Sequence, residues 1–134
     1  MRKNELEQRR IEAAKILAIL KTQEAKLTEI KQSQERNSKE LDGLYNQDLL
    51  DIQQVEGHRD FGIKLTIDTV NQERIIANTK AILEKKQIEV QEAHKKVEIL
   101  QKLKEKQEQE YYKAFLDAEA KEIDDITSAR FNIE

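Results

Sequence analysis

Helix-breaking residues are confined to one short region of this chain. The sequence has no proline, and its three glycines are Gly43, Gly57 and Gly62. Proline and glycine are the residues that most strongly mark turns and the ends of helices. The 134 residues are therefore expected to form one long helix before this region and a second long helix after it.

The composition supports helices that pack side by side rather than a compact globule. Charged residues make up 38% of the chain and aromatic residues only 4%, which leaves few large side chains for a globular core. A mixture of Ala, Glu, Lys, Leu, Gln and Arg is typical of long helices and coiled coils. Low hydrophobicity and high charge are also typical of disordered chains. Two features argue against disorder: charges of both signs are interleaved, and the apolar residues recur with a period.

The apolar period is seven residues on both sides of the glycine region. Positions seven apart form a stripe on a helix that a second helix can cover. In the first segment the two rows of this stripe are Leu6, Ala13, Leu20, Leu27, Gln34, Leu41 and Arg9, Ile16, Gln23, Ile30, Asn37, Leu44. In the second segment one row is Ile76, Leu83, Val90, Val97, and the companion row holds Leu65, Ala93, Leu100, Ala114.

These rows predict an all-α fold, an antiparallel coiled-coil hairpin formed as a single domain over residues 1–134. Gly43 follows Asp42 and is expected to cap the first helix with a positive φ. The predicted segments are a helix at about 3–42, a turn with a short helix at about 43–60, and a helix at about 61–131. Because the second helix is the longer one, its C-terminal part, including residues 99–125, is expected to overhang the hairpin without an intramolecular partner.

No catalytic, cofactor or metal site is expected. The chain has no cysteine, and neither His58 nor His94 has a second ligand at metal-binding spacing. Acidic residues such as Asp124 and Asp125 perform acid–base chemistry when a cleft shifts their pKa values, and two packed helices offer no cleft. The sequence therefore predicts a protein that is not an enzyme.

Charge and hydropathy also restrict the partners. The formal net charge is −3, and the basic residues at the N-terminus (Arg2, Lys3, Arg9, Arg10) alternate with Glu5 and Glu7, so nucleic acid is not an expected partner. No segment approaches the roughly 20 apolar residues of a membrane span, and the N-terminus lacks the apolar core of a secretory signal. A soluble, cytoplasmic protein is expected.

Aromatic residues gather in the predicted overhang. Tyr111, Tyr112 and Phe115 lie close together there, and Ile123 continues the apolar face. Tyr111 and Phe115, four residues apart, could simply pair on the surface of the helix. Alternatively, the cluster could anchor a partner, because exposed aromatic residues dominate the binding energy of many interfaces.

Two long stretches resemble the flagellar FliJ family, the small coiled-coil component of the type III export apparatus. They are "KKVEILQKLKEKQEQEYYKAFLDAEAKEIDDITSARF" and "GHRDFGIKLTIDTVNQERIIANTKAILEKKQIEVQEAHKK". FliJ proteins are similar to the γ subunit of rotary F-type ATPases. The resemblance implies a non-enzymatic stalk in the cytoplasm, peripheral to the inner membrane, that inserts into the hexamer of the export ATPase FliI and promotes its assembly and activity. It also implies contacts with the cytoplasmic domain of the export gate FlhA and with escort chaperones of late substrates.

The resemblance also suggests which residues meet these partners. The positions that match the family's gate-binding stripes are Gln23, Leu27, Phe61 and Leu65, and the tyrosines usual further along the first stripe are Ile30 and Gln34 here. The positions expected to contact the ATPase ring follow instead from the uncovered aromatic cluster of the overhang, and they are Tyr111, Tyr112, Phe115 and Ile123.

Other functions fit a helical hairpin of this composition. They are a general coiled-coil adaptor, a prefoldin-like holdase chaperone, and a peripheral stalk subunit of a rotary ATPase. Exposed coiled-coil seams also allow self-association.

Overall fold

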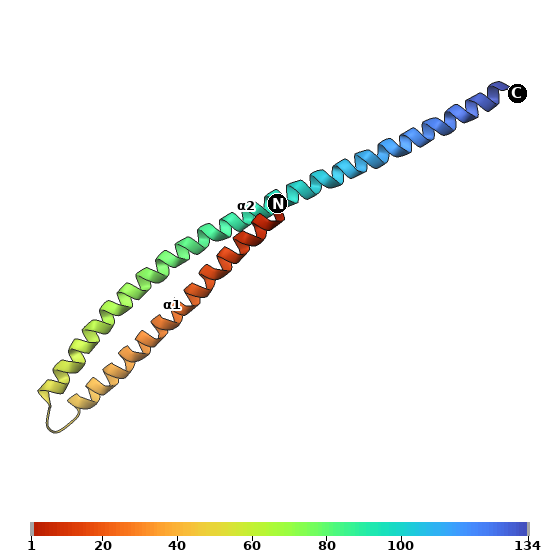
Figure 1. The fold of residues 1–134 in the computed structure, drawn as a ribbon. Coiled ribbons are helices and arrows are strands. Elements are labelled where there is room, and N and C mark those ends of the chain that lie inside the picture. The colour runs from red at the N-terminus through yellow and green to blue at the C-terminus, as the bar shows by residue number, and fades with distance from the viewer. Residues whose placement is uncertain (1, 134) are drawn as a thin grey trace. The chain divides into compact units, whose positions relative to one another are not determined.

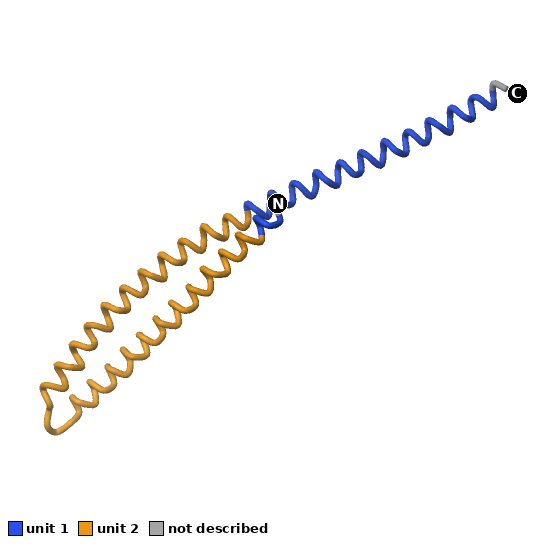
Figure 2. Tube along the Cα trace, in the orientation of Figure 1, with its two compact units in different colours: residues 1–6, 92–134 blue, residues 7–91 orange. Residues whose placement is uncertain are grey.

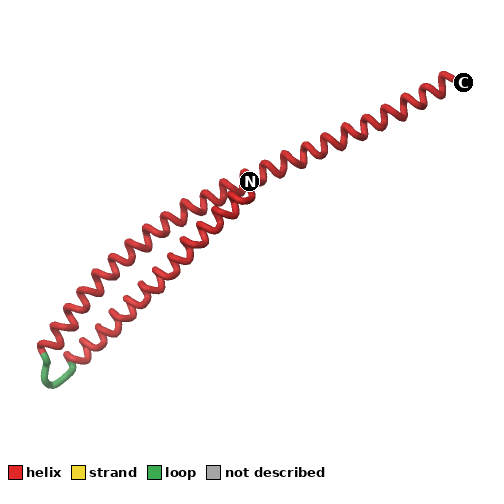
Figure 3. Tube along the Cα trace, viewed as in Figure 1, coloured by secondary structure: helices red, strands yellow, loops and turns green. Residues whose placement is uncertain are grey.

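The computed structural model describes residues 2–133 of the chain, and the side chains of residues 3–131. It contains two helices, α1 (Arg2–Tyr45) and α2 (Ile52–Ile133), joined by a loop at residues 46–51 (Figures 1 and 3). Hydrogen bonds join Asn37 to His58 and Gln23 to Gln72. The earlier residue of α1 thus pairs with the later residue of α2, so the two helices run antiparallel. The predicted all-α, antiparallel two-helix fold with a longer second helix is confirmed.

The chain divides into two compact units, whereas the sequence predicts one domain (Figure 2). The hairpin unit comprises residues 7–91 and contains most of α1, the loop and the N-terminal half of α2. The terminal unit comprises residues 1–6 and 92–134, and its buried side chains include Leu6 and Ala93.

A seam of buried and half-buried residues runs along both helices. In α1, every position of the two predicted rows is buried or half-buried, including the polar members Arg9, Gln23 and Asn37. In α2, the seam alternates steps of three and four residues through Val55, His58, Gly62, Leu65, Thr69, Gln72, Ile76, Thr79, Leu83, Lys86, Val90, Ala93 and Val97. This alternation is the spacing of a left-handed coiled coil.

The companion row of α2 is buried only where α1 covers it, as the expected overhang of residues 99–125 implies. Leu65 and Ala93 are buried, but Leu100 and Ala114 are exposed. They continue the seven-residue spacing beyond the part of α2 that α1 covers, and no other part of the described chain covers them.

The apolar centre of the hairpin unit is small. Leu20, Ile76 and Leu83 form one buried cluster, against which Ile16 and Leu27 pack. Among the described residues no large side chain is completely buried. The hairpin therefore depends strongly on these few contacts.

The predicted turn was too long at both ends. The helix α1 continues through Gly43 to Tyr45, and α2 begins at Ile52 rather than near residue 61. The predicted short helix is therefore not separate, because its C-terminal part forms the first turn of α2. Asp51 explains this early start, because its Oδ1 atom accepts a hydrogen bond from the backbone N–H of Gln54 at 3.3 Å, as a helix N-cap does.

The predicted positive φ at Gly43 was also wrong. No glycine among the described residues has a positive φ. The backbone N–H of Asn46 instead donates to the carbonyl oxygen of Asp42 at 3.2 Å, which carries the helical hydrogen-bonding pattern past the glycine.

Gly62 provides the space for a polar contact inside the seam. The Nδ2 atom of Asn37 donates to the carbonyl oxygen of His58 at 2.9 Å, and the Oδ1 atom of Asn37 lies 2.8 Å from Nδ1 of His58. A Cβ atom placed on Gly62 would lie 3.2 Å from Nδ2 of Asn37. Because a buried asparagine in a coiled-coil seam favours one register over others, this contact fixes the alignment of the two helices near the loop.

Alanine should have different effects at the two glycines of α2. Gly57→Ala is expected to raise the free energy of unfolding by about 1 kcal/mol, because glycine is a poor helix former and, apart from its chain neighbours and the backbone of the local helix, no atom lies within 4 Å of the added Cβ. Gly62→Ala is expected to lose much of that gain through crowding of Asn37. Urea denaturation followed by circular dichroism measures both, and equal gains would contradict the role given to Gly62.

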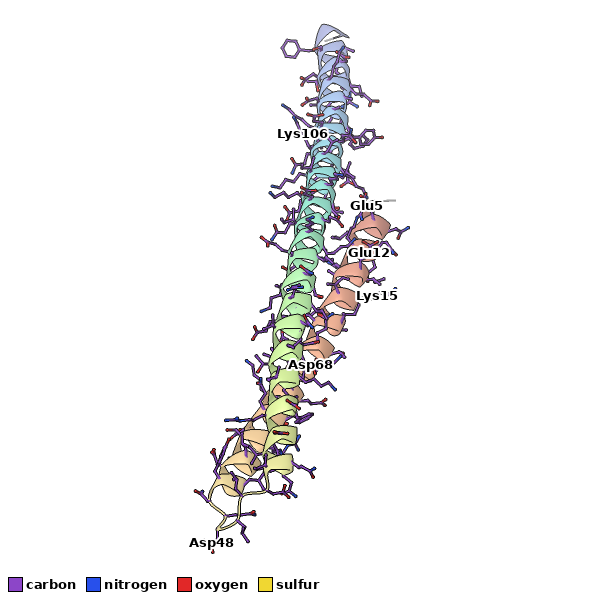
Figure 4. The ribbon with its side chains drawn as sticks, turned by 90° about the vertical axis from the view of Figure 1, so that its left-hand side faces the viewer. Glu5, Glu12, Lys15, Asp48, Asp68 and Lys106 are labelled. Carbon is purple, nitrogen blue, oxygen red and sulfur yellow. The ribbon has the colours of Figure 1, made fainter. Side chains whose placement is uncertain are left out.

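A network of ion pairs joins the helices near the start of α1. Arg9 pairs with Glu12 and with Glu89, and Lys86 pairs with the same two carboxylates, at 3.3–3.7 Å. Figure 4 marks Glu12 on α1. The hydrogen bond from Lys86 holds the pKa of Glu12 below its usual value of 4.5, and the nearby charges of Lys86 and Arg9 act in the same direction.

This lowered pKa predicts a loss of stability in acid. A carboxylate with a lowered pKa stabilises the fold above its ordinary pKa and loses that contribution as the pH falls through its folded-state value. Glu12→Gln is therefore expected to lower the melting temperature at neutral pH and to have little effect well below pH 4.5. Glu5→Gln, at an exposed carboxylate of α1, is the control. A Glu12→Gln effect that did not shrink in acid would contradict this interpretation.

Candidate partner-binding surface

The C-terminal part of α2 is exposed on all sides. Every residue from Glu98 to Phe131 is exposed, and in Figure 4 the side chains near Lys106 point outward from α2 with no second segment beside them. We call residues 98–133 the C-terminal arm. The predicted overhang is confirmed, because nothing in the described chain covers residues 99–125.

Apolar side chains of the arm gather on one face. Tyr112, Leu116, Glu119, Ile123 and Ile126 follow one another at steps of four, three, four and three residues. Residues at these steps are neighbours on a helix surface. Phe115 and Glu122 lie along one edge of this row, about 40° and 60° from Glu119 around the helix, because successive helical residues are about 100° apart. The arm face is therefore defined as Tyr112, Phe115, Leu116, Glu119, Glu122, Ile123 and Ile126.

The structure brings three of the four predicted ring-contact residues onto the arm face. Tyr112, Phe115 and Ile123 belong to it, and all three are at least half exposed. Tyr111 lies beside the face, one turn before Phe115, and is 78% exposed. Their contact with a partner stays a prediction. The site residues predicted from the sequence did not include Glu119 and Glu122, although their spacing from the aromatic residues places them on the same face.

The four predicted gate-contact residues do not form one exposed patch. Leu65 is buried, with 5% of its surface exposed. Gln23 and Leu27 are half-buried in the seam, where the backbone oxygen of Gln23 accepts a hydrogen bond from Gln72 at 2.9 Å. Phe61 alone of the four is exposed, at 45%. Their role also stays a prediction.

Phe61 borders an open groove near the loop end of the hairpin unit. The groove is lined by Ser33, Arg36, Asn37, Glu40, Gln54, Gly57, His58 and Phe61. His58 faces Asn37 and lies 3.7 Å from the carboxylate of Glu40. Polar side chains thus surround the aromatic ring of Phe61 on this side of the hairpin.

Within the described residues no cluster of three metal-binding side chains occurs. His94, the second histidine, lies beside Glu98 on the same helix at 3.4 Å. No described helix is long and apolar enough to cross a bilayer.

Comparison with known protein families identifies the family of this chain. The sequence model of a protein family described as flagellar FliJ protein matches residues 1–133. The chain belongs to the flagellar FliJ family. As a FliJ-family member it is a component of the flagellar export apparatus and a non-catalytic stalk protein. No curated protein and no solved structure gives a significant match.

FliJ membership agrees with the features of the chain described above. The match extends over both helices and the arm, so the exposed end of α2 belongs to the family's architecture. The prefoldin-like alternative would require a β-hairpin between the helices, and the described loop at 46–51 contains no strand.

Proposed function

We propose that this FliJ-family protein acts as a stalk in the export apparatus. Its C-terminal arm inserts into the hexameric ring of the export ATPase FliI and promotes ring assembly and ATP hydrolysis. The hairpin unit remains outside the ring and links the ATPase to the cytoplasmic domain of the export gate FlhA and to escort chaperones. The protein then works in the cytoplasm, at the inner-membrane base of the flagellum.

The exposed arm is the observation that carries this proposal. A single helix with no partner is poorly stabilised in water, because most helical stability in proteins comes from packing one face. The arm nevertheless presents two aromatic and three aliphatic side chains on one face. Such a face gains stability only when a second protein covers it, and the interior of a ring provides cover over the whole length of a helix.

The hairpin unit offers a separate surface for the gate. Among the four gate-contact positions implied by the family, Phe61 is accessible without any change in the hairpin. Leu65 and Leu27 stabilise the seam, so we assign them the supporting role of holding Phe61 in place. The acidic and basic residues around the groove give polar contacts that suit a reversible interaction.

A shortened chain that ends at Val97 tests this division of roles. It keeps every seam residue described above, so the hairpin is expected to retain its helix content and cooperative unfolding. We expect it to lose most of the stimulation of FliI ATP hydrolysis, because the arm is absent. We expect it to keep its affinity for the FlhA cytoplasmic domain, because Phe61 is present.

Two measurements decide the outcome: the FliI hydrolysis rate at saturating stalk protein, and gate binding by calorimetry. The full-length chain is the reference in both. Undiminished stimulation by the shortened chain would contradict insertion of the arm. Loss of gate binding with an intact hairpin would contradict the assignment of the gate to the hairpin unit.

A further inference from the structure

We propose that the arm face docks on an apolar protein surface that supplies a basic side chain to Glu119 and Glu122. This inference rests on the proposed function and specifies the chemistry of the FliI surface that receives the arm. Glu119 lies at the centre of the face, with Phe115, Leu116 and Ile123 as its neighbours three or four residues away. The arm face is therefore an apolar stripe with a carboxylate in its middle.

No described side chain of the protein forms an ion pair with this carboxylate. Positions three and four residues from Glu119 are Phe115, Leu116, Glu122 and Ile123. Glu122 is a like charge, and like charges at this spacing destabilise a helix slightly. Among the described side chains, no ion pair includes Glu119 or Glu122.

The nearby lysines of the arm lie on other sides of the helix. At about 100° per residue, Lys121 is turned about 200° from Glu119 and Lys113 about 120°. Both lysines therefore stay away from the surface that a partner covering Tyr112 and Ile123 would bury. The negative charge of the stripe is left for the partner to neutralise.

Burial makes a cationic partner group necessary. In the free protein Glu119 is exposed to water, so its charge is well solvated. A partner that covers Phe115, Leu116 and Ile123 removes water from the carboxylate between them, and an unpaired buried charge is strongly unfavourable. A partner surface made only of apolar residues would therefore bind the arm face poorly, because it would bury the Glu119 carboxylate without a cation. An arginine is well suited, because its planar group can donate to two neighbouring carboxylates.

A second copy of the chain is a poorer occupant than a basic partner. Two basic residues of the described arm lie on the side of Glu119: Arg130, eleven residues after it, and Lys104, fifteen residues before it and about 60° away. Pairing Arg130 of one copy with Glu119 of another would overlap only the ends of the two arms. An antiparallel pairing of Lys104 with Glu119 would set Glu108 opposite Phe115, so apolar side chains of one arm would meet a charged part of the other. The surface that binds the arm is therefore expected to belong to a different protein, and under the proposed function to FliI.

The test compares charge removal on two sides of the same helix in the full-length chain. Glu119→Gln removes the charge within the face, and Asp117→Asn, about 160° away, removes one outside it. We expect Glu119→Gln to weaken FliI binding by about tenfold or more, because truncating one partner of a buried charge pair has effects of that order. We expect Asp117→Asn to change binding by less than about twofold, as for a solvated charge. Circular dichroism checks that both variants keep their helix content.

Glu119→Leu distinguishes a cationic partner surface from an apolar one. If FliI supplies a basic side chain, this variant binds more weakly than the wild type, because the basic group is left buried without its partner. Tighter binding by Glu119→Leu, or equal binding by Glu119→Gln and Asp117→Asn, would overturn the inference while leaving the proposed function intact. Wild-type protein that neither binds nor stimulates FliI would overturn both. Self-association that is lost in Glu119→Gln, with FliI binding unchanged, would overturn the inference in favour of a second copy.

Discussion

Replacing Leu83 with alanine is expected to lower the free energy of unfolding of the hairpin by about 2–4 kcal/mol. Leu83 is one of the three residues of the apolar cluster, and only 9% of its surface is exposed. Loss of a buried leucine removes its transfer free energy and leaves a space that the neighbours fill incompletely. In a two-helix hairpin with so small a core, we expect a large fall in the urea midpoint.

The neighbouring Ile82 is a matched control. It lies on the same helix, one residue away, but 47% of its surface is exposed. Ile82→Ala should change the free energy of unfolding by no more than about 0.5 kcal/mol, as for most surface substitutions. Urea denaturation followed by circular dichroism measures both variants. Equal effects at the two positions would show that the cluster around Leu83 does not hold the helices together.

Replacing Tyr112 and Phe115 together by alanine is expected to weaken FliI binding by about a hundredfold. Both side chains belong to the arm face and are 62% and 51% exposed, so no contact within the described chain is lost. Aromatic anchors at the centre of an interface commonly contribute about 2 kcal/mol or more each, although their effects do not add fully. Stimulation of ATP hydrolysis at limiting stalk concentration should fall in parallel.

Phe131 supplies the control for this double variant. It is the same residue type as Phe115, is 81% exposed, and is turned about 160° from Phe115 around the helix. Phe131→Ala should leave both binding and stimulation close to those of the wild type. If Phe131→Ala were as harmful as the double variant, the arm would contact FliI on all sides and the arm face would have no special role.

The sequence was sufficient to predict the fold because the breakers and the apolar period agree. The confinement of the glycines to one region predicted two helices, and the seven-residue rows of α1 predicted the seam residue by residue. The seam of α2 was harder to recognise because it contains His58, Gln72, Thr79 and Lys86. Polar residues at these positions hide the period, and only the contacts with α1 show that they face inward.

The loop boundaries could not be predicted for a different reason. From the sequence, Gly57 and Gly62 predict a turn, but tertiary packing overrides the weak preference of a single glycine. A glycine fits at position 62 inside α2 because Nδ2 of Asn37 lies where a Cβ atom would be crowded. This contact joins residues far apart in the sequence. Asp51, the N-cap of α2, is a residue type that favours a helix start. The glycines after it favour a turn, so the sequence did not lead to the correct start of α2.

The candidate surface was predictable in part. The lengths of the helices implied an uncovered arm, and the aromatic cluster indicated where a partner would bind. The arm face itself required the regular helix that the structure shows across residues 98–131, because only then do Glu119 and Glu122 share a side with the aromatic residues. The gate positions came from family resemblance alone, and the structure places most of them in the seam.

No described part of the chain covers residues 98–131, and this affects how a partner recognises the arm. Its backbone amides are protected from hydrogen exchange only by the helix itself, and an isolated helix opens and closes within microseconds or less. A binding site that receives the arm must therefore select or complete a fluctuating helix, and part of the interaction free energy offsets the entropy of ordering it. We therefore expect the proposed complex with FliI to combine a long contact surface with moderate affinity, which would allow the arm to bind and dissociate repeatedly.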